Sequence, residues 1–291
     1  MAKVLVTGCS TGIGFEAALT FARAGDRVYA TMRNLAKAGP LRDAAAAESL
    51  DVRIVQLDVD SQVSIDRAIE QIVAEAGQID VLVNNAGVTG VGVVEEVTDE
   101  QIHAVFETNF FGPLRVIRAV LPAMRERGSG TIVNVSSVAG RLAAPAYVRY
   151  HSSKWALECA TETLAIEVKQ FGIRVASIEP GFFVTPILDK AVRQWNEREA
   201  SPYEDIERRM RDLYAIAGEN GGDPAVVAAT IYDAATTTTP RLRWPIGADA
   251  QPFIDGRNRL SDEEYQVLGE RMTDEQWWAK FAELFPMPVE A

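Results

Sequence analysis

The sequence predicts an α/β protein with one doubly wound, mostly parallel seven-stranded sheet and helices on both of its faces. Short runs rich in β-branched residues recur along the chain, and helical stretches of about a dozen or more residues separate them. Repeated strand–helix units build a mostly parallel sheet through right-handed crossovers. A chain of 291 residues with 47% hydrophobic residues is long enough to bury the core of such a sheet.

We expect seven strands in this sheet, at residues 3–7, 27–31, 52–57, 81–84, 131–135, 173–178 and 241–246. Between residues 185 and 222 the chain becomes rich in charge, which indicates an insertion between core elements. A further helix begins near Asp223-Pro224, because proline suits the first helical position. We therefore expect one domain over residues 1–250, including the insertion, and a C-terminal extension at 251–291 packed on it.

The extension carries an amphipathic pattern that predicts a capped helix starting at Thr273-Asp274-Glu275. Its apolar residues are Trp277, Trp278, Phe281, Leu284 and Phe285. Such a helix can be a subunit contact, a cover over a pocket or an anchor on a membrane surface. Residues 261–291 contain eight acidic and two basic residues, and this net charge of -6 disfavours anionic lipid.

The charge and composition of the chain argue against several classes of partner and of site. The 29 Lys and Arg residues stand against 41 Asp and Glu residues, and a net charge of -12 opposes binding to nucleic acid. The two cysteines and two histidines, Cys9, Cys159, His103 and His151, suit neither a disulfide framework nor a metal site, so we expect no metal. The first apolar run is three residues long, and no stretch reaches the ~20 residues of a membrane span. We expect a cytoplasmic protein without integral membrane contact.

The first strand runs into a glycine-rich turn, Gly8 to Gly14, which opens a helix. Backbone N–H groups and a helix N-terminus in this arrangement bind a pyrophosphate, so the turn predicts a Rossmann-like dinucleotide-binding fold. A tight turn that holds no ligand is the alternative. The string Gly8-Cys9-Ser10-Thr11-Gly12 also fits the nucleophile elbow of a serine hydrolase. That enzyme class needs a histidine far downstream, and the last one here is His151, so the hydrolase interpretation is disfavoured.

The end of the second strand bears on the choice of cofactor. An NAD-binding fold places a carboxylate there, against the ribose 2′-hydroxyl, whereas this sequence has Thr31-Met32-Arg33-Asn34. The Arg33 guanidinium can donate two hydrogen bonds to a 2′-phosphate, and Ser10 can add a hydroxyl. NADP(H) is therefore favoured, with NAD(H) as the alternative if Arg33 is merely solvated.

Three residues predict a reactive site. Tyr150 and Lys154 are four residues apart on one helical face, which continues through Leu157, Thr161, Leu164 and Val168. An ammonium group on a buried face is costly unless its charge is used. Ser137 follows the fifth strand at the carboxyl edge of the sheet, where such sheets bind ligands, although a serine there also suits a simple turn.

Asn109 lies on the apolar face of the helix after the fourth strand, four residues before Pro113. Proline has no N–H to donate to the Asn109 carbonyl, so the pattern predicts a kink and a carbonyl that is able to hold a water molecule. An ordinary bent helix with a satisfied amide is the alternative.

These motifs together resemble the short-chain dehydrogenase/reductase family over residues 1 to about 250. The resemblance rests on Thr7 to Gly14, Asn84-Asn85-Ala86-Gly87, Asn109, Ser137, Tyr150 to Lys154, and Pro180-Gly181 followed by Thr185. Two local strings, Val28 to Arg33 and Gly128-Ser129-Gly130, are similar to the hydroxysteroid and retinol dehydrogenase branch.

The resemblance implies catalytic roles for four residues. Tyr150 is the general acid/base, Lys154 lowers its pKa and holds the nicotinamide ribose, Ser137 orients the carbonyl, and Asn109 maintains a water relay. Because a free phenol has a pKa near 10, the ammonium and the oxidised nicotinamide are expected to lower it by ~2 to 3 units. The resemblance also implies a homodimer or homotetramer.

The expected cofactor contacts follow from the same motifs. They are Gly8, Ser10, Thr11, Gly12, Ile13, Gly14, Arg33, Asp58, Val59, Asn85, Ala86, Gly87, Tyr150, Lys154, Pro180, Gly181 and Thr185. The resemblance assigns Asp58 to the adenine amino group, Asn85 to the floor on the adenosine side, and Thr185 to the nicotinamide carboxamide or the phosphates.

The loops expected around the nicotinamide are apolar: Val88, Val91, Val93, Val94, Leu142, Ala143, Pro145, Val148, Phe182, Phe183, Ile187 and Leu188. They favour an apolar substrate such as a steroid, a retinoid or a lipid-like molecule, unless the loops pack on one another around a small one. Residues 185–222 are expected to be a substrate lid. The sequence thus predicts an NADP(H)-dependent oxidoreductase acting on an alcohol and a ketone or aldehyde. A catalytically silent NADP-binding sensor is the alternative, and the four filled catalytic positions count against it.

Overall fold

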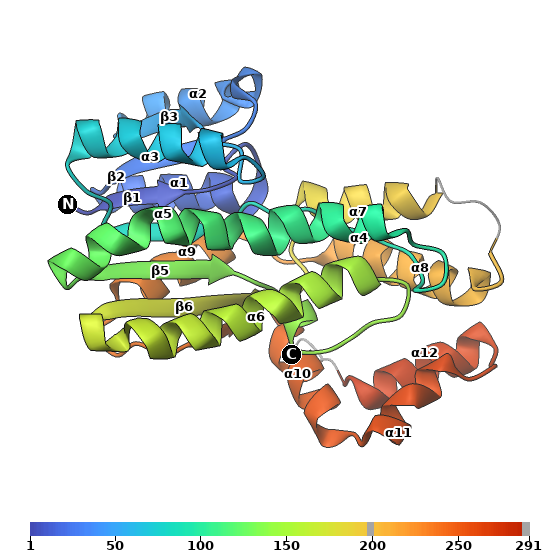
Figure 1. The fold of residues 1–291 in the computed structure, drawn as a ribbon. Helices are drawn as coiled ribbons and strands as arrows, with labels where there is room; N and C mark the ends of the chain where they lie inside the picture. Colours follow the sequence, from blue (N-terminus) through green and yellow to red (C-terminus); the bar gives the residue numbers. More distant parts are fainter. Residues whose placement is uncertain (197–200, 287–291) are drawn as a thin grey trace.

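The protein is built on seven parallel strands in the order β3-β2-β1-β4-β5-β6-β7, as seen in a computed structural model that describes residues 1–196 and 201–286 (Figure 1). The strands are β1 Lys3–Val6, β2 Arg27–Met32, β3 Val52–Gln56, β4 Val81–Asn84, β5 Gly130–Val135, β6 Ile173–Pro180 and β7 Arg243–Ile246. The predicted fold class is confirmed, and all seven predicted strands are present with ends that differ by two residues at most. The strand order reverses between β1 and β4, and ligands bind at such a reversal in parallel sheets.

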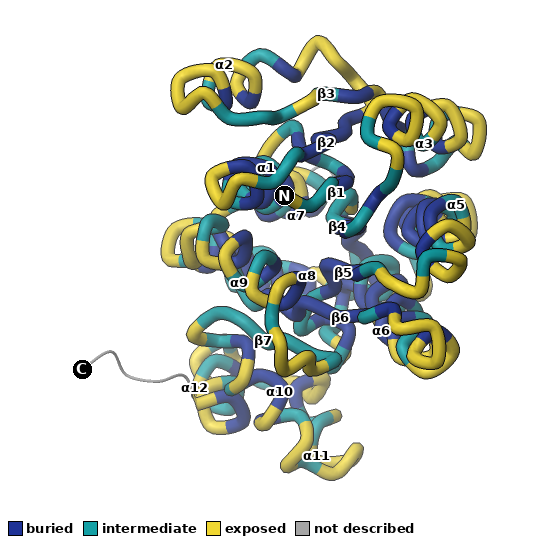
Figure 2. The backbone as a smooth tube through the Cα atoms, turned by 90° about the vertical axis from the view of Figure 1, so that its left-hand side faces the viewer, coloured by how far each residue is buried: buried dark blue, intermediate teal, exposed yellow. Residues whose placement is uncertain are grey.

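Two groups of helices cover the two faces of the sheet (Figure 2). On one face lie α1 Gly12–Arg23, α2 Gly39–Ala47 and α9 Pro224–Thr236, and on the other lie α3 Gln62–Ala76, α5 Gly112–Arg127 and α6 Val148–Val168. Side chains alternate along each strand, so Val4 and Val6 join the first hydrophobic cluster and Leu5 joins the second. The sheet is buried on both faces, and this explains why its strands read as short apolar runs.

Local signals fix the helix ends that the sequence predicts. The Asp223 carboxylate accepts the Ala225 N–H at 2.8 Å, and Pro224 occupies the first position of α9, as expected. Gly128 ends α5 in the left-handed region, with φ of +69°, and so lets the chain turn into β5.

A π-helical turn, Glu107–Phe111, separates α4 Asp99–Phe106 from α5. Pro113 cannot donate a hydrogen bond to the Asn109 carbonyl, so a regular α-helix cannot continue through this position. The irregularity predicted at Asn109 is therefore present, in the form of this turn.

Helices from two separate stretches lie beyond the carboxyl ends of the strands (Figure 1). The predicted lid contains α7 Pro186–Asn196 and α8 Glu204–Asn220, while its residues 197–200 lie outside the described residues. The C-terminal stretch contains α10 Ala250–Arg259, α11 Asp262–Gln266 and α12 Asp274–Leu284, and residues 287–291 lie outside the described residues. Thr273 and Gln276 form a capping box at the start of α12, where the sequence predicts one.

Both stretches share a third hydrophobic cluster, which joins the lid helices to the C-terminal helices. Across the described ranges, no helix is both long and apolar enough to span a membrane.

Candidate functional site

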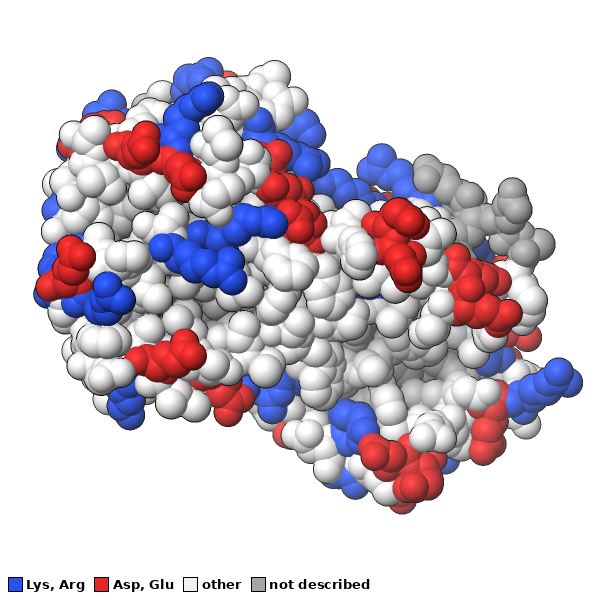
Figure 3. Space-filling model, viewed as in Figure 1, with Lys and Arg blue, Asp and Glu red and all other residues white. Residues whose placement is uncertain are grey.

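A cavity of about 350 Å³ opens at the carboxyl ends of the strands and gathers residues from most of the chain. Of the predicted cofactor contacts, its walls include Gly8, Ser10, Thr11, Gly12, Ile13, Arg33, Asp58, Val59, Asn85, Ala86, Gly87, Tyr150, Lys154, Pro180, Gly181 and Thr185. The remaining one, Gly14, lies behind the wall. In the space-filling view the surface is hollowed next to α12, and the hollow shows mainly uncharged side chains (Figure 3).

Gly14 packs the glycine loop against the end of β4. A Cβ on Gly14 would lie 2.3 Å from Asn85 Nδ2 and 2.5 Å from the Gly8 carbonyl oxygen. Asn85 Nδ2 in turn donates to the carbonyl oxygens of Thr7, at 2.9 Å, and Gly8, at 3.2 Å. Gly14 thus lets the two loops that line the cavity lie against each other, and its predicted direct contact with the cofactor stays a prediction.

The start of α1 suits an anion. Thr11 makes no side-chain capping bond to this helix, and its first turn contains no acidic residue. The N–H groups of a first helical turn have no acceptor inside the helix, so a phosphate oxygen is a good partner for them. Gly12, with φ of +62°, brings this turn close to the Thr185 side chain.

Two cations stand where the ribose end of a dinucleotide would lie. Arg33 is exposed at the end of β2, and Asn34 and Lys37 line the same part of the cavity. Lys37 was not among the predicted cofactor contacts, because it lies in a short 3-10 helix after the strand rather than at the strand end.

Asp60 carries an acceptor with no partner in the same region. Thr108 donates to its Oδ2 at 3.0 Å, whereas its buried Oδ1 has no hydrogen-bond partner among the described residues. Burial raises the pKa of this carboxyl group, and the nearby Arg33 lowers it. Buried polar atoms are nearly always paired, so an unpaired oxygen in a cavity wall suits a donor on a ligand.

Tyr150 and Lys154 both line the cavity from the first turns of α6. Lys154 is 5% exposed, and its Nζ donates to the Val135 carbonyl oxygen at 2.9 Å, which ties α6 to the end of β5. The same Nζ lies 5.7 Å from the centre of the Tyr150 ring. Burial lowers the pKa of Lys154 to about 8, against a smaller opposing effect of Glu158.

The expected lowering of the Tyr150 pKa is not found in the protein alone. Burial raises this pKa to about 12, and the hydrogen bond with Ser137 offsets only part of the rise. Desolvation of the phenol is the dominant effect, and the Lys154 ammonium donates its hydrogen bond to the Val135 carbonyl rather than to the phenol. The phenol is therefore protonated at neutral pH.

Ser137 caps a short 3-10 helix, Val138–Gly140, at the end of β5. Its Oγ accepts the Ala139 N–H at 3.1 Å and donates to the Pro180 carbonyl oxygen at 3.4 Å. These bonds hold the hydroxyl between the Pro180-Gly181 segment and Tyr150.

Asn109 does not line the cavity but supports residues that do. Its Nδ2 donates to the Val88 carbonyl oxygen at 2.9 Å and to Ser153 Oγ at 3.0 Å, while its Oδ1 accepts the Val88 N–H at 2.8 Å. The side chain, 1% exposed, thereby joins the loop after β4 to α6. The water relay through its main-chain carbonyl stays a prediction.

His151 follows Tyr150 but faces another group. Its Nδ1 bonds the Leu142 carbonyl oxygen at 2.7 Å, and because a carbonyl can only accept, Nδ1 carries the proton. Burial lowers the pKa of this imidazole to about 4, so it is neutral and holds the Leu142 loop.

The predicted apolar wall is correct in part. The cavity is lined by Val88, Leu142, Pro145, Phe182, Phe183, Ile187 and Leu188, but not by Val91, Val93, Val94, Ala143 or Val148. Val91 and Val93 are buried in the third hydrophobic cluster, where the loop packs on the lid, and Val94 is 75% exposed. The loop thus turns part of its apolar surface away from the cavity.

The sequence did not predict the part of the wall that comes from α8 and the C-terminal stretch, nor Tyr147 before α6. The residues from α8 and the C-terminal stretch are Met210, Leu213, Tyr214, Phe253, Tyr265, Leu268, Trp277, Phe281 and Phe285. The apolar periodicity of 273–285 was a signal that some surface is covered, but the pattern does not say which one.

A family comparison agrees with this geometry. The family model for short chain dehydrogenases matches residues 2–196, about two thirds of the chain. The chain belongs to the short-chain dehydrogenase family. The region matched contains Asn109, Ser137, Tyr150 and Lys154, and it ends within the lid.

Other members of the short-chain dehydrogenase family are similar over most of the chain. Retinol dehydrogenase 8 of Bos taurus is 40% identical over 262 residues, which are 86% of this chain and 83% of that protein. The crystal structure of a short-chain dehydrogenase from Streptomyces avermitilis is 36% identical, with a TM-score of 0.78 and 97% of both chains covered. An actinorhodin polyketide ketoreductase with NADPH is 31% identical, with a TM-score of 0.71 over 83% of this chain and 95% of that one. These similarities confirm the predicted family and its resemblance to the retinol dehydrogenase branch.

Proposed function

We propose that this protein is an NADP(H)-dependent oxidoreductase that interconverts an alcohol and a ketone or aldehyde, with Tyr150 as the general acid/base. The observation that carries the proposal is that Tyr150, Lys154 and Ser137 meet in one wall of the cavity that also holds the glycine loop. A pyrophosphate on that loop and the start of α1 would direct the nicotinamide towards these three side chains.

The residues can divide the chemistry of a reduction among them. NADPH, when bound, supplies a hydride to the carbonyl carbon. The Ser137 hydroxyl donates a hydrogen bond to the carbonyl oxygen, and the Tyr150 hydroxyl gives its proton to the same oxygen. The Lys154 ammonium then stabilises the phenolate. A phenol with a pKa of about 12 is protonated before the reaction, so it has a proton to donate to the carbonyl oxygen during reduction.

The ribose end of the cavity supports NADP(H) over NAD(H). Arg33 and Lys37 place two positive charges there, and the end of β2 has no carboxylate to bind a ribose 2′-hydroxyl. The similar actinorhodin ketoreductase was solved with NADPH. The start of α1, which has no side-chain cap, fits the pyrophosphate. Asp58 remains the residue proposed for the adenine amino group, and the unpaired Oδ1 of Asp60 offers a second acceptor in the same part of the wall.

The walls beyond Tyr150 support an apolar substrate. Phe182, Leu188, Tyr214, Phe253 and Phe281 surround this part of the cavity. Burying the apolar surface of a ligand against this wall is favourable, which suits a steroid, a retinoid or another lipid-like carbonyl compound.

We propose further that residues 185–222 are a substrate lid on a domain that spans residues 1–250. Limited proteolysis with and without NADPH and substrate tests this role. Protection of α7 and α8 only in the presence of ligand supports it, and equal cleavage in both states contradicts it.

Tyr150→Phe tests the proposed function directly. The variant keeps the aromatic ring but lacks the hydroxyl that donates the proton, so kcat/KM for carbonyl reduction should fall by about 10²- to 10⁴-fold. NADPH binding, followed by nicotinamide fluorescence, should stay within about twofold of the parent protein. Undiminished turnover would refute the assigned mechanism, and NADPH binding without turnover of any carbonyl by the unmodified protein would favour the sensor alternative.

A further inference from the structure

The C-terminal helices contribute Phe253, Trp277 and Phe281 to the wall of the cavity. Aromatic rings lead there from Tyr150 in an unbroken series, with centres 4.8 to 6.2 Å apart at each step. The rings belong, in order, to Tyr150, Tyr147, Tyr214, Phe182, Phe253, Phe281 and Trp277. The series starts on α6, crosses the lid helix α8 and ends on α12.

Trp277 and Phe281 are the last two rings of this series and form a stacked pair. Their ring centres are 5.2 Å apart with an interplanar angle of 16°, and Trp277 is 1% exposed. The Trp277 indole N–H donates to the Leu268 carbonyl oxygen at 3.0 Å, so its one donor is already engaged. Both side chains line the cavity, and what they offer a ligand is a flat apolar surface.

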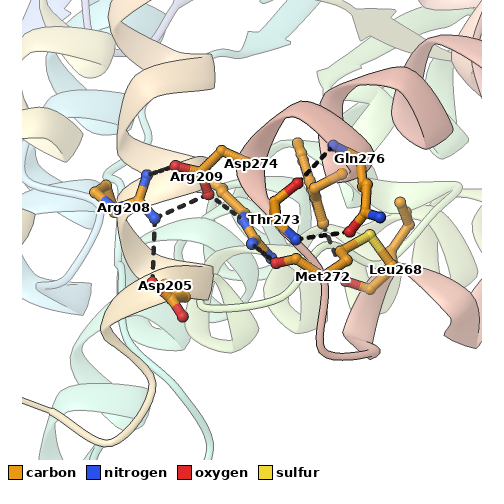
Figure 4. A network of polar contacts seen from close by, with 9 residues as sticks. Asp205, Arg208, Arg209, Leu268, Met272, Thr273, Asp274 and Gln276 are labelled. Atoms are coloured by element: carbon orange, nitrogen blue, oxygen red, sulfur yellow. Dashed lines mark hydrogen bonds and ion pairs between the residues drawn. The ribbon is translucent and has the colours of Figure 1, made fainter.

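An ion-pair network lies at the start of α12, the helix that carries this pair (Figure 4). Asp274, at the start of α12, lies between Arg208 and Arg209 of α8: Arg208 Nη2 is 2.9 Å from Asp274 Oδ1, and Arg209 Nε is 3.0 Å from the same oxygen. Arg209, 3% exposed, also donates to the Met272 carbonyl oxygen at 2.6 Å, and its guanidinium lies 5.8 Å from the Trp277 ring centre. We call Asp274, Arg208 and Arg209 the α8–α12 clasp.

The clasp joins two segments that are distant in sequence but face the same cavity. The two guanidinium groups lower the pKa of Asp274 to about 2, so the clasp is ionised at every pH at which the protein is expected to work. Asp274 also lies in the first turn of α12, where a negative charge stabilises the helix.

We propose that Trp277 and Phe281 are specificity-determining residues that limit how long a substrate the cavity accepts, and that Asp274 positions them through the α8–α12 clasp. The protein then selects compact apolar carbonyl compounds, of ring-system or short-chain size, over long acyl chains. This inference rests on the proposed function, because it names the size class of the substrate of the same site.

A length series of straight-chain aldehydes, from hexanal to hexadecanal with NADPH, tests the end wall in the full chain. For the parent protein, kcat/KM should rise with chain length and then fall once the chain meets α12. In Trp277→Ala and Phe281→Ala, kcat/KM should begin to fall only at aldehydes that are several carbons longer than for the parent protein. Each additional methylene that the enlarged cavity can bury should raise kcat/KM by about fourfold. If circular dichroism shows that Trp277→Ala does not fold, Phe281→Ala alone provides the test. An unchanged length limit in a folded variant overturns the proposal.

The clasp is tested by Asp274→Asn against the matched control Asp262→Asn. Both aspartates lie in the first turn of a helix with a capping box, and both pair with arginine, but Asp262 pairs with Arg257 of α10 inside the C-terminal stretch. Asp274→Asn should raise KM for every aldehyde about fivefold with little change in kcat, and it should speed amide hydrogen exchange in α12. Asp262→Asn should do neither. The same response from both variants overturns the role of the clasp.

Failure of the proposed function is separable from failure of this inference. If the parent protein reduces no aldehyde, the proposed function fails. The end wall is then judged by the increase in thermal unfolding temperature that the matching fatty alcohols produce. A limit that moves to longer alcohols in Phe281→Ala still supports the wall, and one that does not move overturns it.

Discussion

Replacing Lys154 with methionine should make the cofactor-free protein more stable. Burial lowers the pKa of Lys154 from 10.5 to about 8, and each unit corresponds to about 1.4 kcal/mol, so holding the charged ammonium in the fold costs about 3 kcal/mol at neutral pH. Methionine has a similar length and no charge, although it loses the hydrogen bond to Val135, which contributes about 1 kcal/mol. The expected net gain is about 2 kcal/mol.

The pH dependence gives the sign of the effect. Below pH 8 the lysine is charged in both states, and the folded protein bears the full penalty. Between pH 8 and 10.5 the folded state releases its proton first, so the penalty disappears as the pH rises. The stability of the parent protein should therefore approach that of Lys154→Met over this window. Tyr150 and the other groups that titrate there are present in both proteins and cancel.

Urea unfolding at pH 7 and pH 10 measures both effects. At pH 7 the variant should unfold at a higher urea concentration, with a thermal midpoint about 5 °C higher. Lys169→Met, at the exposed end of the same helix, should change stability by less than about 0.5 kcal/mol. A Lys154→Met protein that is less stable than the parent at pH 7 would refute the reasoning, because the ammonium would then be held by favourable contacts.

Three further changes test other parts of the site. Arg33→Asp should shift the ratio of NADPH to NADH affinity at least tenfold towards NADH, measured by fluorescence titration, and an unchanged ratio would remove Arg33 from the 2′-phosphate site. Gly14→Ala should destabilise the protein by about 1–3 kcal/mol and weaken NADPH binding, because the new Cβ would lie 2.5 Å or less from atoms of Asn85 and Gly8. Gly218→Ala is the control, because a Cβ there has no atom within 4 Å. Equal unfolding midpoints for the two variants would contradict this prediction. Asp249→Ala should lower the free energy of unfolding by about 1–3 kcal/mol, because it removes the carboxylate that accepts the Phe182 N–H at 2.8 Å. Asp249→Asn should recover most of this loss. An Asp249→Ala protein as stable as the parent would contradict the role of that bond.

Local patterns were sufficient to predict the sheet. The runs that became β1 to β7 are short, apolar and β-branched because both faces of the sheet are covered, and the helices between them force parallel strands. The two lid helices were not predicted as helices. The segment 204–220 does carry an apolar stripe at helical spacing, formed by Ile206, Met210, Leu213, Tyr214 and Ala217, but its many charges led to its interpretation as an insertion without assigned helices.

The site was predictable where chemistry and local spacing coincide. Tyr150 and Lys154 are one helical turn apart, so their neighbourhood follows from the sequence. The pKa of Tyr150 did not follow, because it depends on how completely the phenol is buried and on the carbonyl of Val135 that engages the lysine. The position of Trp277 in the cavity wall could not be predicted either, because it depends on contacts between α8 and α12, whose residues are about 70 positions apart. The homodimer or homotetramer stays a prediction.

The π-helical turn at Glu107–Phe111 also sets the rotation of the helix that follows it. Val105 and Met124 are both buried, yet nineteen residues separate them, which in a regular α-helix is five turns plus about 100°. The wider turn takes up about one residue, which corresponds to about 100° of helix rotation. Deleting one residue within the turn would rotate α5 by about 100° relative to α4. Either Asn109 or the core residues of α5 would then face the wrong way, so the length of this segment is fixed from both ends.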